Sequence, residues 1–195
     1  VHLDEIAAAA REGIIAAGGT PFEFPSIAIC DGLAMGHAGM CYPLASRELI
    51  ADSIEAMMLA HALDGLVLLT NCDKITPGMM MAMARLNVPA ILISGGPMLA
   101  GCFQGQSVDV SNLADLAGMV QRGEISEEDR EDYFEATAPT CGACAGLFTA
   151  NSMNCMAEAL GLALPGNGTI PAVYGARRAL AKHAGTRVME LFNEE

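Results

Sequence analysis

The sequence predicts an α/β domain of three layers, α/β/α, in which helices cover both faces of a mainly parallel sheet. Two short runs, residues 65–70 and 89–94, are apolar with almost no polar alternation, as expected for strands buried on both sides. Stretches with helical spacing of apolar residues alternate with these runs, which is the order of a parallel sheet with helical crossovers. The 195 residues suffice for one core, and no repeat or linker divides them, so we expect a single domain over residues 1–195.

The first part of the chain is expected to hold a helix, a strand, a loop and a second helix. An apolar stripe predicts a helix over residues 3–17, which Gly18-Gly19 ends. The run 26–30 predicts a short strand, and the Gly- and Met-rich residues 31–41 predict an ordered loop. Ser46 is a good N-cap residue and predicts that the next helix begins there.

The later part of the chain is expected to be mostly helical. Thr76-Pro77 is a helix-start signal, since Thr can cap a helix and Pro is tolerated in the first turn. Turn residues and apolar spacing then predict helices over 76–86, 110–135 with a break at Gly123, 148–162 and 171–193, and a loop over 139–146.

Charge and hydropathy exclude several classes of protein. The formal net charge is −13, with only 10 Lys and Arg, which argues against a nucleic-acid-binding face. Two stretches without charge, 86–108 and 136–157, are broken by Gly and Pro and carry polar residues, so we expect no membrane span. The hydrophobic fraction of 52% is high for a soluble domain, and it is consistent either with a surface that meets another domain or subunit, or with alanine-rich composition.

The cysteines indicate a reducing compartment. There are seven, an odd number, and the acidic start of the chain does not resemble a secretory signal. We therefore expect reduced thiols in a cytoplasmic protein rather than a disulfide framework. Most of the seven are expected to be small buried hydrophobic residues.

Reactive side chains crowd the end of the predicted strand 65–70. Asn71-Cys72-Asp73-Lys74 follows it directly, and Asp31 follows Cys30 at the end of the predicted strand 26–30. The carboxyl ends of parallel strands form the ligand-binding edge of open α/β sheets, so Asp31 and Asp73 are expected to converge there. Two carboxylates suit Mg²⁺, although aspartates often only cap loops. Lys74 would repel a cation as an ammonium; it would have to pair with the carboxylates or be modified.

Cys141-x-x-Cys144 lies in a loop before a predicted helix and leaves several interpretations open. It could be a thioredoxin-like redox pair, because a helix N-terminus lowers the pKa of a thiol. It could be half of a zinc site, or it could supply iron–sulfur ligands together with thiols from other segments. A turn with incidental thiols is equally consistent with the spacing. Ser94-Gly95-Gly96-Pro97 is more typical of a plain turn than of an anion site.

Taken together, five segments resemble the dihydroxy-acid/phosphogluconate dehydratase family, in the right order and over nearly the whole chain. The stretches that follow Asp31 and Ser46 look more like the branched-chain dihydroxy-acid members than the phosphogluconate branch. The matching segments are Asp31-Gly32-Leu33-Ala34-Met35-Gly36-His37, Ser46-Arg47-Glu48-Leu49-Ile50-Ala51-Asp52-Ser53, Asn71-Cys72-Asp73-Lys74-Ile75-Thr76-Pro77-Gly78-Met79, Ser94-Gly95-Gly96-Pro97-Met98, and Pro139-Thr140-Cys141-Gly142-Ala143-Cys144-Ala145-Gly146 with Phe148-Thr149-Ala150-Asn151-Ser152-Met153-Asn154.

The resemblance implies an activity and a set of ligands. The activity is that of a hydro-lyase, which dehydrates 2,3-dihydroxy acids such as 2,3-dihydroxyisovalerate to 2-oxo acids in branched-chain amino-acid biosynthesis. Cys72 and Cys144 would bind an iron–sulfur cluster, 2Fe-2S or 4Fe-4S. Asp31, Asp73 and Lys74 would bind Mg²⁺, with Lys74 carboxylated to a carbamate, which removes the repulsion noted above.

Some functional residues of the family, and one of its domains, have no counterpart in this sequence. Members of the family are longer. Their third cluster cysteine, where present, lies before the position of Val1. Their serine base and a further acidic Mg²⁺ ligand lie in a C-terminal domain. We therefore expect most of an N-terminal domain, inactive alone, without a catalytic base of its own, whose partners are that C-terminal domain, a dihydroxy-acid substrate and a second copy in a homodimer. The alternatives are a sugar-acid dehydratase of the same family, a non-catalytic iron–sulfur or redox module, and a thioredoxin-like dithiol protein.

Overall fold

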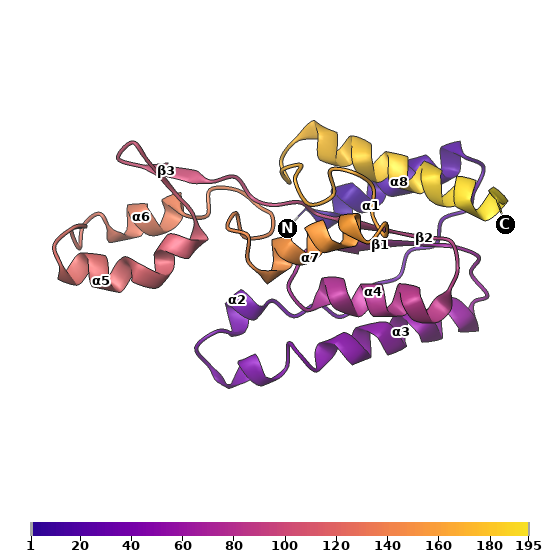
Figure 1. The fold of residues 1–195 in the computed structure, drawn as a ribbon, viewed down its shortest axis with the longest axis horizontal. Helices are drawn as coiled ribbons and strands as arrows, with labels where there is room; N and C mark the ends of the chain where they lie inside the picture. Colours follow the sequence, from indigo (N-terminus) through magenta and orange to yellow (C-terminus); the bar gives the residue numbers. More distant parts are fainter. Residues whose placement is uncertain (1, 195) are drawn as a thin grey trace.

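The computed structural model describes residues 2–194 and has the predicted three layers (Figure 1). Strands β1 and β2 are parallel, in a register that pairs Leu66 with Ala90 and Thr70 with Ser94. Helices α1 and α8 cover one face of this sheet, and α3 and α4 cover the other, where α7 also packs against α4. The bounds are α1 Leu3–Ala16, α3 Ser46–Ala60, β1 Leu66–Thr70, α4 Ile75–Leu86, β2 Ala90–Ser94, α7 Thr149–Ala159 and α8 Gly175–Glu194.

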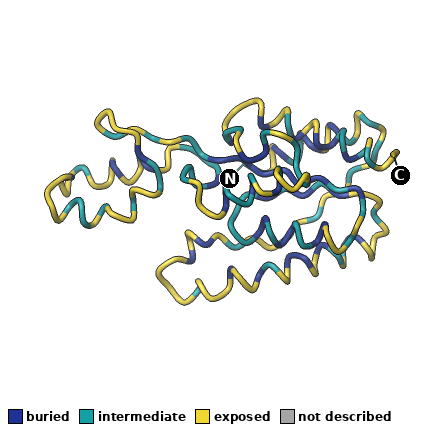
Figure 2. The backbone as a smooth tube through the Cα atoms, viewed as in Figure 1, coloured by how far each residue is buried: buried dark blue, intermediate teal, exposed yellow. Residues whose placement is uncertain are grey.

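Alternate residues of β1 feed two separate cores. Leu66 and Leu68 pack against α3 and α4, whereas Val67 and Leu69 pack against α1 and α8. Side chains alternate between the two faces of a strand, so an apolar run without polar alternation is what burial on both faces requires. Figure 2 shows the resulting buried backbone along the middle layer. The prediction that residues 65–70 and 89–94 contain strands buried on both faces is confirmed.

Small residues let α1 and α8 approach closely. A Cβ atom placed on Gly185 would collide with the backbone oxygen of Ala10, and one placed on Gly13 would collide with the backbone oxygen of Lys182. Ala181 and Ala184 complete the contact and are fully buried. The close packing of α1 against α8 therefore depends on the absence of side-chain atoms at these two glycines.

The predicted strand at residues 26–30 is wrong. These residues have no strand assignment, and short helical turns follow them: α2 (Asp31–Ala34) and the 3-10 helix η1 (Ala38–Cys41). The apolar pattern is suited to a strand, but no neighbouring strand among residues 2–194 exchanges hydrogen bonds with it. The predicted convergence of three strand ends therefore reduces to the ends of β1 and β2.

Two predicted helix caps are also wrong by one or two residues. Helix α4 begins at Ile75, after Lys74, and Thr76 lies inside its first turn. The Thr76 hydroxyl instead hydrogen-bonds with the Thr70 hydroxyl (2.9 Å) and donates to the carbonyl oxygen of Cys72 (3.1 Å). Ser46 is the first helical residue of α3 rather than its cap, and its hydroxyl donates to the Pro43 carbonyl oxygen (2.6 Å).

A small lobe projects beside the sheet (Figure 1). It has its own core, centred on Val108, Ile125 and Tyr133, and the Tyr133 ring meets Phe103 edge-on at 5.1 Å between centroids. The predicted helical segments are confirmed here, whereas the hairpin before them was missed. The elements are β3 Gly101–Phe103, antiparallel to β4 Gln106–Val108, then η2 Val110–Asp115, α5 Leu116–Gln121 and α6 Arg130–Ala136.

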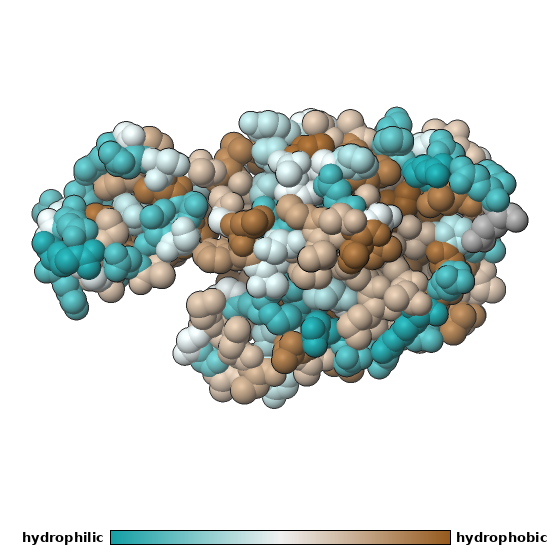
Figure 3. Space-filling model, in the orientation of Figure 1, coloured by the Kyte–Doolittle hydropathy of each residue, from teal (hydrophilic) through white to brown (hydrophobic). Residues whose placement is uncertain are grey.

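Apolar side chains remain on the surface in places. Leu33, Met35 and Leu44, all near α2 and η1, are more than half exposed, and apolar surface is visible over much of the molecule in Figure 3. Exposed apolar residues near α2 and η1 are consistent with the high hydrophobic fraction of the sequence. Within residues 2–194, no helix combines the length and the hydropathy needed to cross a bilayer.

The close contact of α1 with α8 gives a testable prediction. Replacing Gly185 by Ala should lower the free energy of unfolding by about 1–3 kcal/mol, because the added methyl group must push the two helices apart. Gly175→Ala is the matched control: nothing lies within 4 Å of its added Cβ, so stability should stay equal or rise slightly. Denaturant unfolding of both variants measures the difference, and equal stabilities would contradict the close packing.

Candidate functional site

The candidate site lies at the carboxyl ends of β1 and β2, where sequence analysis placed it. Asn71 to Lys74 form the turn from β1 into α4, and Asp31 opens α2 beside that turn. The loop that carries Cys144 lies against the end of β2, because Pro97 and Ala143 form an isolated parallel bridge. Three segments distant in sequence thus meet at one edge of the sheet, in the region where α2, α4 and α7 begin (Figure 1).

Lys74 holds the two predicted aspartates together. Its Nζ donates to Oδ2 of Asp31 at 2.9 Å and also donates to Oδ2 of Asp73 in a second, shorter contact. The three side chains are only 12–21% exposed, so water screens their charges weakly. The structure therefore brings Asp31, Asp73 and Lys74 together, as predicted, in the form of an ion triad.

The pKa values of this triad move in different directions. Burial raises the pKa of Asp31, and its contact with Asp73 adds to that effect more than Lys74 offsets it. Burial also acts to raise the pKa of Asp73, but hydrogen bonds with Lys74, Asp31 and Thr149 outweigh it and leave the pKa below its ordinary value. Burial acts to lower the pKa of Lys74, and its bonds to the two carboxylates more than reverse this, so the pKa is raised.

Each aspartate keeps one oxygen without a partner. Oδ1 of Asp31 and Oδ1 of Asp73 are buried and receive no hydrogen bond from the described part of the chain. A buried carboxylate oxygen without a donor costs free energy, so such atoms call for an explanation such as a bound ion. Two orphaned carboxylate oxygens at one site match the hard oxygen ligands that Mg²⁺ prefers.

The described residues alone do not complete a metal site. Across residues 2–194, no three His, Cys, Asp or Glu side chains are grouped to hold one metal ion. The ammonium of Lys74 lies where a third ligand would be needed. A carbamate on Lys74 would replace that positive charge by anionic oxygens, and the donor set would then fit a magnesium ion.

Cys72 lies beside a thiol that sequence analysis left out. Burial raises the pKa of Cys72 to about 11; hydrogen bonds from the backbone N–H groups of Asp73 and Asp31 oppose this, and contact with Cys30 adds to it. Cys30 therefore lies next to Cys72. The signal in the sequence was the repeated dipeptide Cys-Asp: if both aspartates reach Lys74, the cysteines that precede them must also lie close together.

Cys144 is held near these groups by a tight loop. The backbone N–H of Met98 donates to the Ala143 oxygen (2.8 Å), and the Ala143 N–H donates to the Gly96 oxygen (2.9 Å). Gly142 has a φ of +134°, and a Cβ there would collide with the backbone of Pro97 and Met98. This position therefore requires glycine. The loop fixes Cys144 relative to β2.

The thiols do not have the character of a redox pair. Burial raises the pKa of Cys144; its own backbone N–H opposes this, and the nearby Cys30 and Asp73 add to the rise. Helix α7 begins only at Thr149, so the expected helix N-terminus does not lie at Cys144. All seven cysteines are free thiols in the structure. A catalytic dithiol requires a lowered pKa, so the geometry disfavours the thioredoxin-like interpretation.

A buried polar network, which sequence analysis missed, braces the strand ends. Asn167 accepts a hydrogen bond from the Ser94 N–H (2.8 Å) and donates to the Asn154 oxygen (3.0 Å), and Asn154 contacts Asn71 (3.5 Å). Arg177 is fully buried and donates to the carbonyl oxygens of Ser94 (3.1 Å) and Asn167 (2.9 Å). Burial lowers the pKa of Arg177 to about 10, which leaves it charged at neutral pH. No periodic pattern in the sequence signals this network.

The turn after β2 belongs to the same framework. Gly96 has a φ of +86°, and a Cβ there would lie 2.7 Å from the Ile170 oxygen. The glycine therefore permits close approach of the chain to residues 170–172. This supports the expected plain turn rather than an anion site.

Comparison with known proteins places the whole chain in one group. The family model described as dihydroxy-acid/6-phosphogluconate dehydratase N-terminal matches residues 1–195. The chain is 60% identical over 195 residues to the dihydroxy-acid dehydratases of Clostridium novyi and Syntrophobacter fumaroxidans, covering 100% of this chain and 35% of each relative. It is 59% identical over 190 residues to that of Halothermothrix orenii, covering 97% of this chain and 34% of the relative. The chain thus spans about a third of the length of these relatives.

The ion triad gives a pH-dependent prediction. Replacing Lys74 by Met should lower the free energy of unfolding at pH 7 by about 2–3 kcal/mol, because two buried carboxylates lose their counter-charge. Lys182→Met is the control; its ion pair with Glu12 is exposed, and its loss should cost less than about 1 kcal/mol.

The sign of the pH effect follows from the pKa shifts. The lowered pKa of Asp73 makes its contribution present above the unfolded value of 3.8, and this contribution is lost as the pH falls through the lower folded value. The raised pKa of Lys74 makes its contribution present below 10.5 and lost only above that. The raised pKa of Asp31 has the opposite sign and reduces the total above 3.8. Urea unfolding should therefore show a smaller difference between Lys74→Met and the parent at pH 3 than at pH 7; equal differences would contradict the triad.

Proposed function

Because the chain belongs to the dihydroxy-acid/6-phosphogluconate dehydratase family, we propose that it forms the metal- and cluster-binding domain of a dihydroxy-acid dehydratase. The proposed whole enzyme is a hydro-lyase that converts 2,3-dihydroxy carboxylic acids, such as 2,3-dihydroxyisovalerate, to 2-oxo acids in branched-chain amino-acid biosynthesis. The 195 residues alone are proposed to be inactive, because they cover only about a third of the length of the relatives that carry this name.

One observation carries the proposal beyond the family name. Asp31 and Asp73, each with one buried oxygen that lacks a donor, meet at Lys74, and Cys72 directly precedes Asp73. Carboxylates and thiolates select different metals, because hard oxygen ligands suit Mg²⁺ and soft sulfur ligands suit iron–sulfur clusters. A site that offers both sets in consecutive residues is suited to hold one small substrate between two inorganic groups.

We propose that Asp31, Asp73 and carboxylated Lys74 hold Mg²⁺. Carboxylation joins CO₂ to the neutral amine of Lys74, forms an N–C bond and releases one proton, which leaves an anionic carbamate. The raised pKa of Lys74 opposes this reaction while both carboxylates remain paired with the ammonium. Binding of a divalent cation favours it, since the cation takes over the counter-charge of both aspartates. Carboxylation and Mg²⁺ binding are therefore proposed to be coupled.

We propose that Cys72 and Cys144 bind the iron–sulfur cluster. Cys72 directly follows β1, and the bridge between Pro97 and Ala143 holds the loop of Cys144 against the end of β2, so both thiols lie at the same edge of the sheet. The Cys72 thiol is protonated at neutral pH, because burial raises its pKa to about 11. Cluster binding should therefore release protons and become more favourable with rising pH. Whether two or four irons are bound is a matter for iron analysis.

The residues of this domain would position rather than exchange protons. When bound, the cluster and Mg²⁺ would supply Lewis acidity for the leaving 3-hydroxyl group and for the charge that develops as the C2 proton is removed. Asp73 is held by its contact with Lys74, and the turn after β1 is braced through the hydrogen bond between Asn71 and Asn154. Such bracing keeps the two sites at a constant separation, which a reaction on adjacent carbon atoms requires. The base that takes the C2 proton is proposed to lie in the rest of the enzyme.

The same proposal covers compartment and assembly. Seven free thiols support a reducing, cytoplasmic location. Exposed apolar side chains near α2 and η1 support burial against the remaining domain or a second copy in a homodimer. A sugar-acid dehydratase is the second candidate within the family, but the relatives reported above all carry the dihydroxy-acid name. Measuring turnover of 2,3-dihydroxyisovalerate against a sugar acid by the full-length enzyme separates the two.

The thiol assignment is testable in the full-length enzyme. Cys72→Ala and Cys144→Ala should lose the visible absorption and most of the bound iron and sulfide. Their kcat/KM should fall at least about 1,000-fold, because Lewis-acid stabilisation is worth several kcal/mol. Cys141→Ala should retain iron, sulfide and activity.

Two results would count against this assignment. Iron retention that depends on Cys141 rather than Cys72 would move the cluster to a different pair of thiols. Full iron binding without any spectral change on addition of a dihydroxy acid would favour a non-catalytic iron–sulfur module.

The magnesium assignment has a matched pair of variants. Lys74→Arg keeps the positive charge between the aspartates but cannot be carboxylated, so it should fold normally and lose Mg²⁺ binding. Native mass spectrometry of the parent enzyme with Mg²⁺ and bicarbonate should show the mass of one added carboxyl group, which Lys74→Arg should lack. Mg²⁺ binding that survives in Lys74→Arg, or an unmodified Lys74 beside bound Mg²⁺, would overturn the carbamate.

A further inference from the structure

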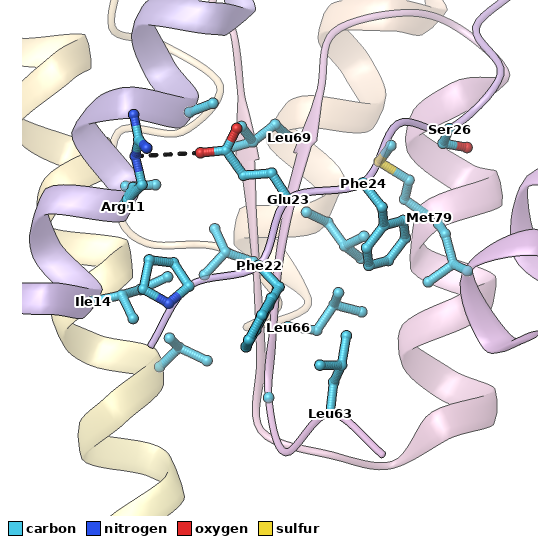
Figure 4. A pocket seen from close by; sticks show the side chains of 18 of the residues that line it. Arg11, Ile14, Phe22, Glu23, Phe24, Ser26, Leu63, Leu66, Leu69 and Met79 are labelled. Atoms are coloured by element: carbon cyan, nitrogen blue, oxygen red, sulfur yellow. Dashed lines mark ion pairs between the residues drawn. The ribbon is translucent and has the colours of Figure 1, made fainter. Parts of the chain in front are cut away.

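A long cavity runs along the outer edge of β1. Its volume is about 960 Å³, and all five residues of β1 line it, from both faces of the strand (Figure 4). Ile14 of α1 and Val188 of α8 border it on one side of the sheet, and Met58 of α3 and Met79 of α4 border it on the other. The cavity therefore continues the plane of the sheet between the two helical layers.

The backbone along this cavity has unused hydrogen-bonding groups. The Leu66 N–H and the Thr70 carbonyl point towards β2, where they bond to Pro89 and Gly95. Backbone groups alternate in direction along a strand, so those of Val67 and Leu69 point into the cavity. No strand lies on that side of β1 within residues 2–194.

The backbone on the far wall of the cavity also lacks hydrogen-bond partners. Residues 19–28 line it, and residues 20–29 make no backbone–backbone hydrogen bond within the described part of the chain. Phe22 projects beside β1 and is 71% exposed, although its neighbour Phe24 packs against the core (Figure 4). Backbone N–H and C=O groups without hydrogen-bond partners line two sides of this apolar cavity. Such groups cost free energy unless another segment forms hydrogen bonds with them.

The cavity has the size of one strand. Neighbouring strands are about 4.8 Å apart, and a packed layer is about 10 Å deep. A slab of that width and depth reaches a volume of 960 Å³ at a length of about 20 Å, which is the length of roughly six extended residues. Strand β1 itself has five residues. A single extended segment would thus fill the space and pair with both walls.

The direction of the missing strand follows from the ends of its neighbours. Residues 20–29 lead to Cys30 and β1 leads to Asn71, and both ends meet near Lys74, so the two walls run parallel. Helix α1 starts at this same edge: a Cβ on Gly95 would lie 2.9 Å from both the Leu3 and the Asn71 side chains. A parallel strand in the cavity would end where α1 begins, and α1 would then connect it to residues 20–29 as a β-α-β unit.

We propose that this cavity holds a third parallel β-strand, supplied by polypeptide directly preceding residue 1 in the longer protein, and that residues 22–29 become a fourth strand beside it. Relatives of which this chain covers 34–35% have the additional length to supply it. The occupant is an apolar extended segment of about six residues, whose side chains alternate between the two helical layers. The predicted strand at residues 26–30 then forms once its partner is present.

Hydrogen exchange of the full-length protein tests the proposal. The amides of Val67 and Leu69 should exchange at least about 100-fold more slowly than unstructured amides, as in a paired strand. Removing the ten or so residues that precede residue 1 should restore fast exchange at these two amides. The amides of Leu66 and Leu68 are the internal control, since they face β2 and should stay protected in both proteins.

Three outcomes of the exchange experiment would overturn the proposal. The first is fast exchange of Val67 and Leu69 in the full-length protein. The second is protection that survives the deletion, because another segment would then fill the cavity. The third is protection that rises with protein concentration, since that would assign the cavity to a second copy.

A pair of substitutions gives an independent readout without any deletion. Phe22 would be covered by the inserted strand, so Phe22→Ser should clearly lower the thermal midpoint of the full-length protein. Leu59→Ser is the control, because Leu59 is similarly exposed (68%) but lies outside the cavity lining. A Phe22→Ser shift no larger than that of Leu59→Ser would contradict the inserted strand.

Discussion

The contact of Lys74 with Asp31 and Asp73 is the constraint on which the site depends. It joins residues 43 positions apart and pulls the start of α2 against the turn between β1 and α4. An ion triad that is only 12–21% exposed has a substantial desolvation cost, so it is not a strong source of stability. Its value is in geometry: it sets the positions of two carboxylates and of the cysteines before them.

In the proposed function, one short turn would serve two kinds of chemistry. Cys72 and Asp73 are consecutive, so their side chains leave the backbone in different directions from nearly the same point. Burial makes the thiol harder to ionise, whereas the hydrogen bonds to Asp73 keep that carboxylate ionised. Under the proposed function, the neutral thiol and the charged carboxylate would be the states of the site before it binds its metals. Each binding event would then be linked to proton release or to loss of the Lys74 ion pair.

Sequence patterns predicted what repeats locally and missed what depends on distant partners. The buried strands and most helices follow from apolar spacing, and Asp73 and Lys74 lie at the end of β1 as predicted. Asp31 meets them through its ion pair with Lys74 rather than through a strand end of its own. No periodic pattern in the sequence indicates that Arg177 is buried beside Ser94 and Asn167. Its partners there are backbone carbonyl oxygens, which every residue carries. Thr76 has the sequence of a cap, but a hydrogen bond to Thr70 holds it inside α4. Cys30 was overlooked for the same reason, since its neighbour Cys72 is remote in sequence.

The one incorrectly predicted strand connects the fold to the site. Residues 20–29 lead into Cys30 and Asp31, so one member of the ion triad, Asp31, directly follows a segment without backbone–backbone hydrogen bonds among residues 2–194. A strand inserted beside β1 would tie this segment into the sheet and fix Asp31 through its backbone as well as through Lys74. Metal retention would then depend on completion of the sheet, even though no atom of the added strand need touch a metal. The apolar pattern of residues 26–30 is correct for a sheet with that extra strand, and the segment leads directly to Asp31, a ligand of the proposed magnesium site.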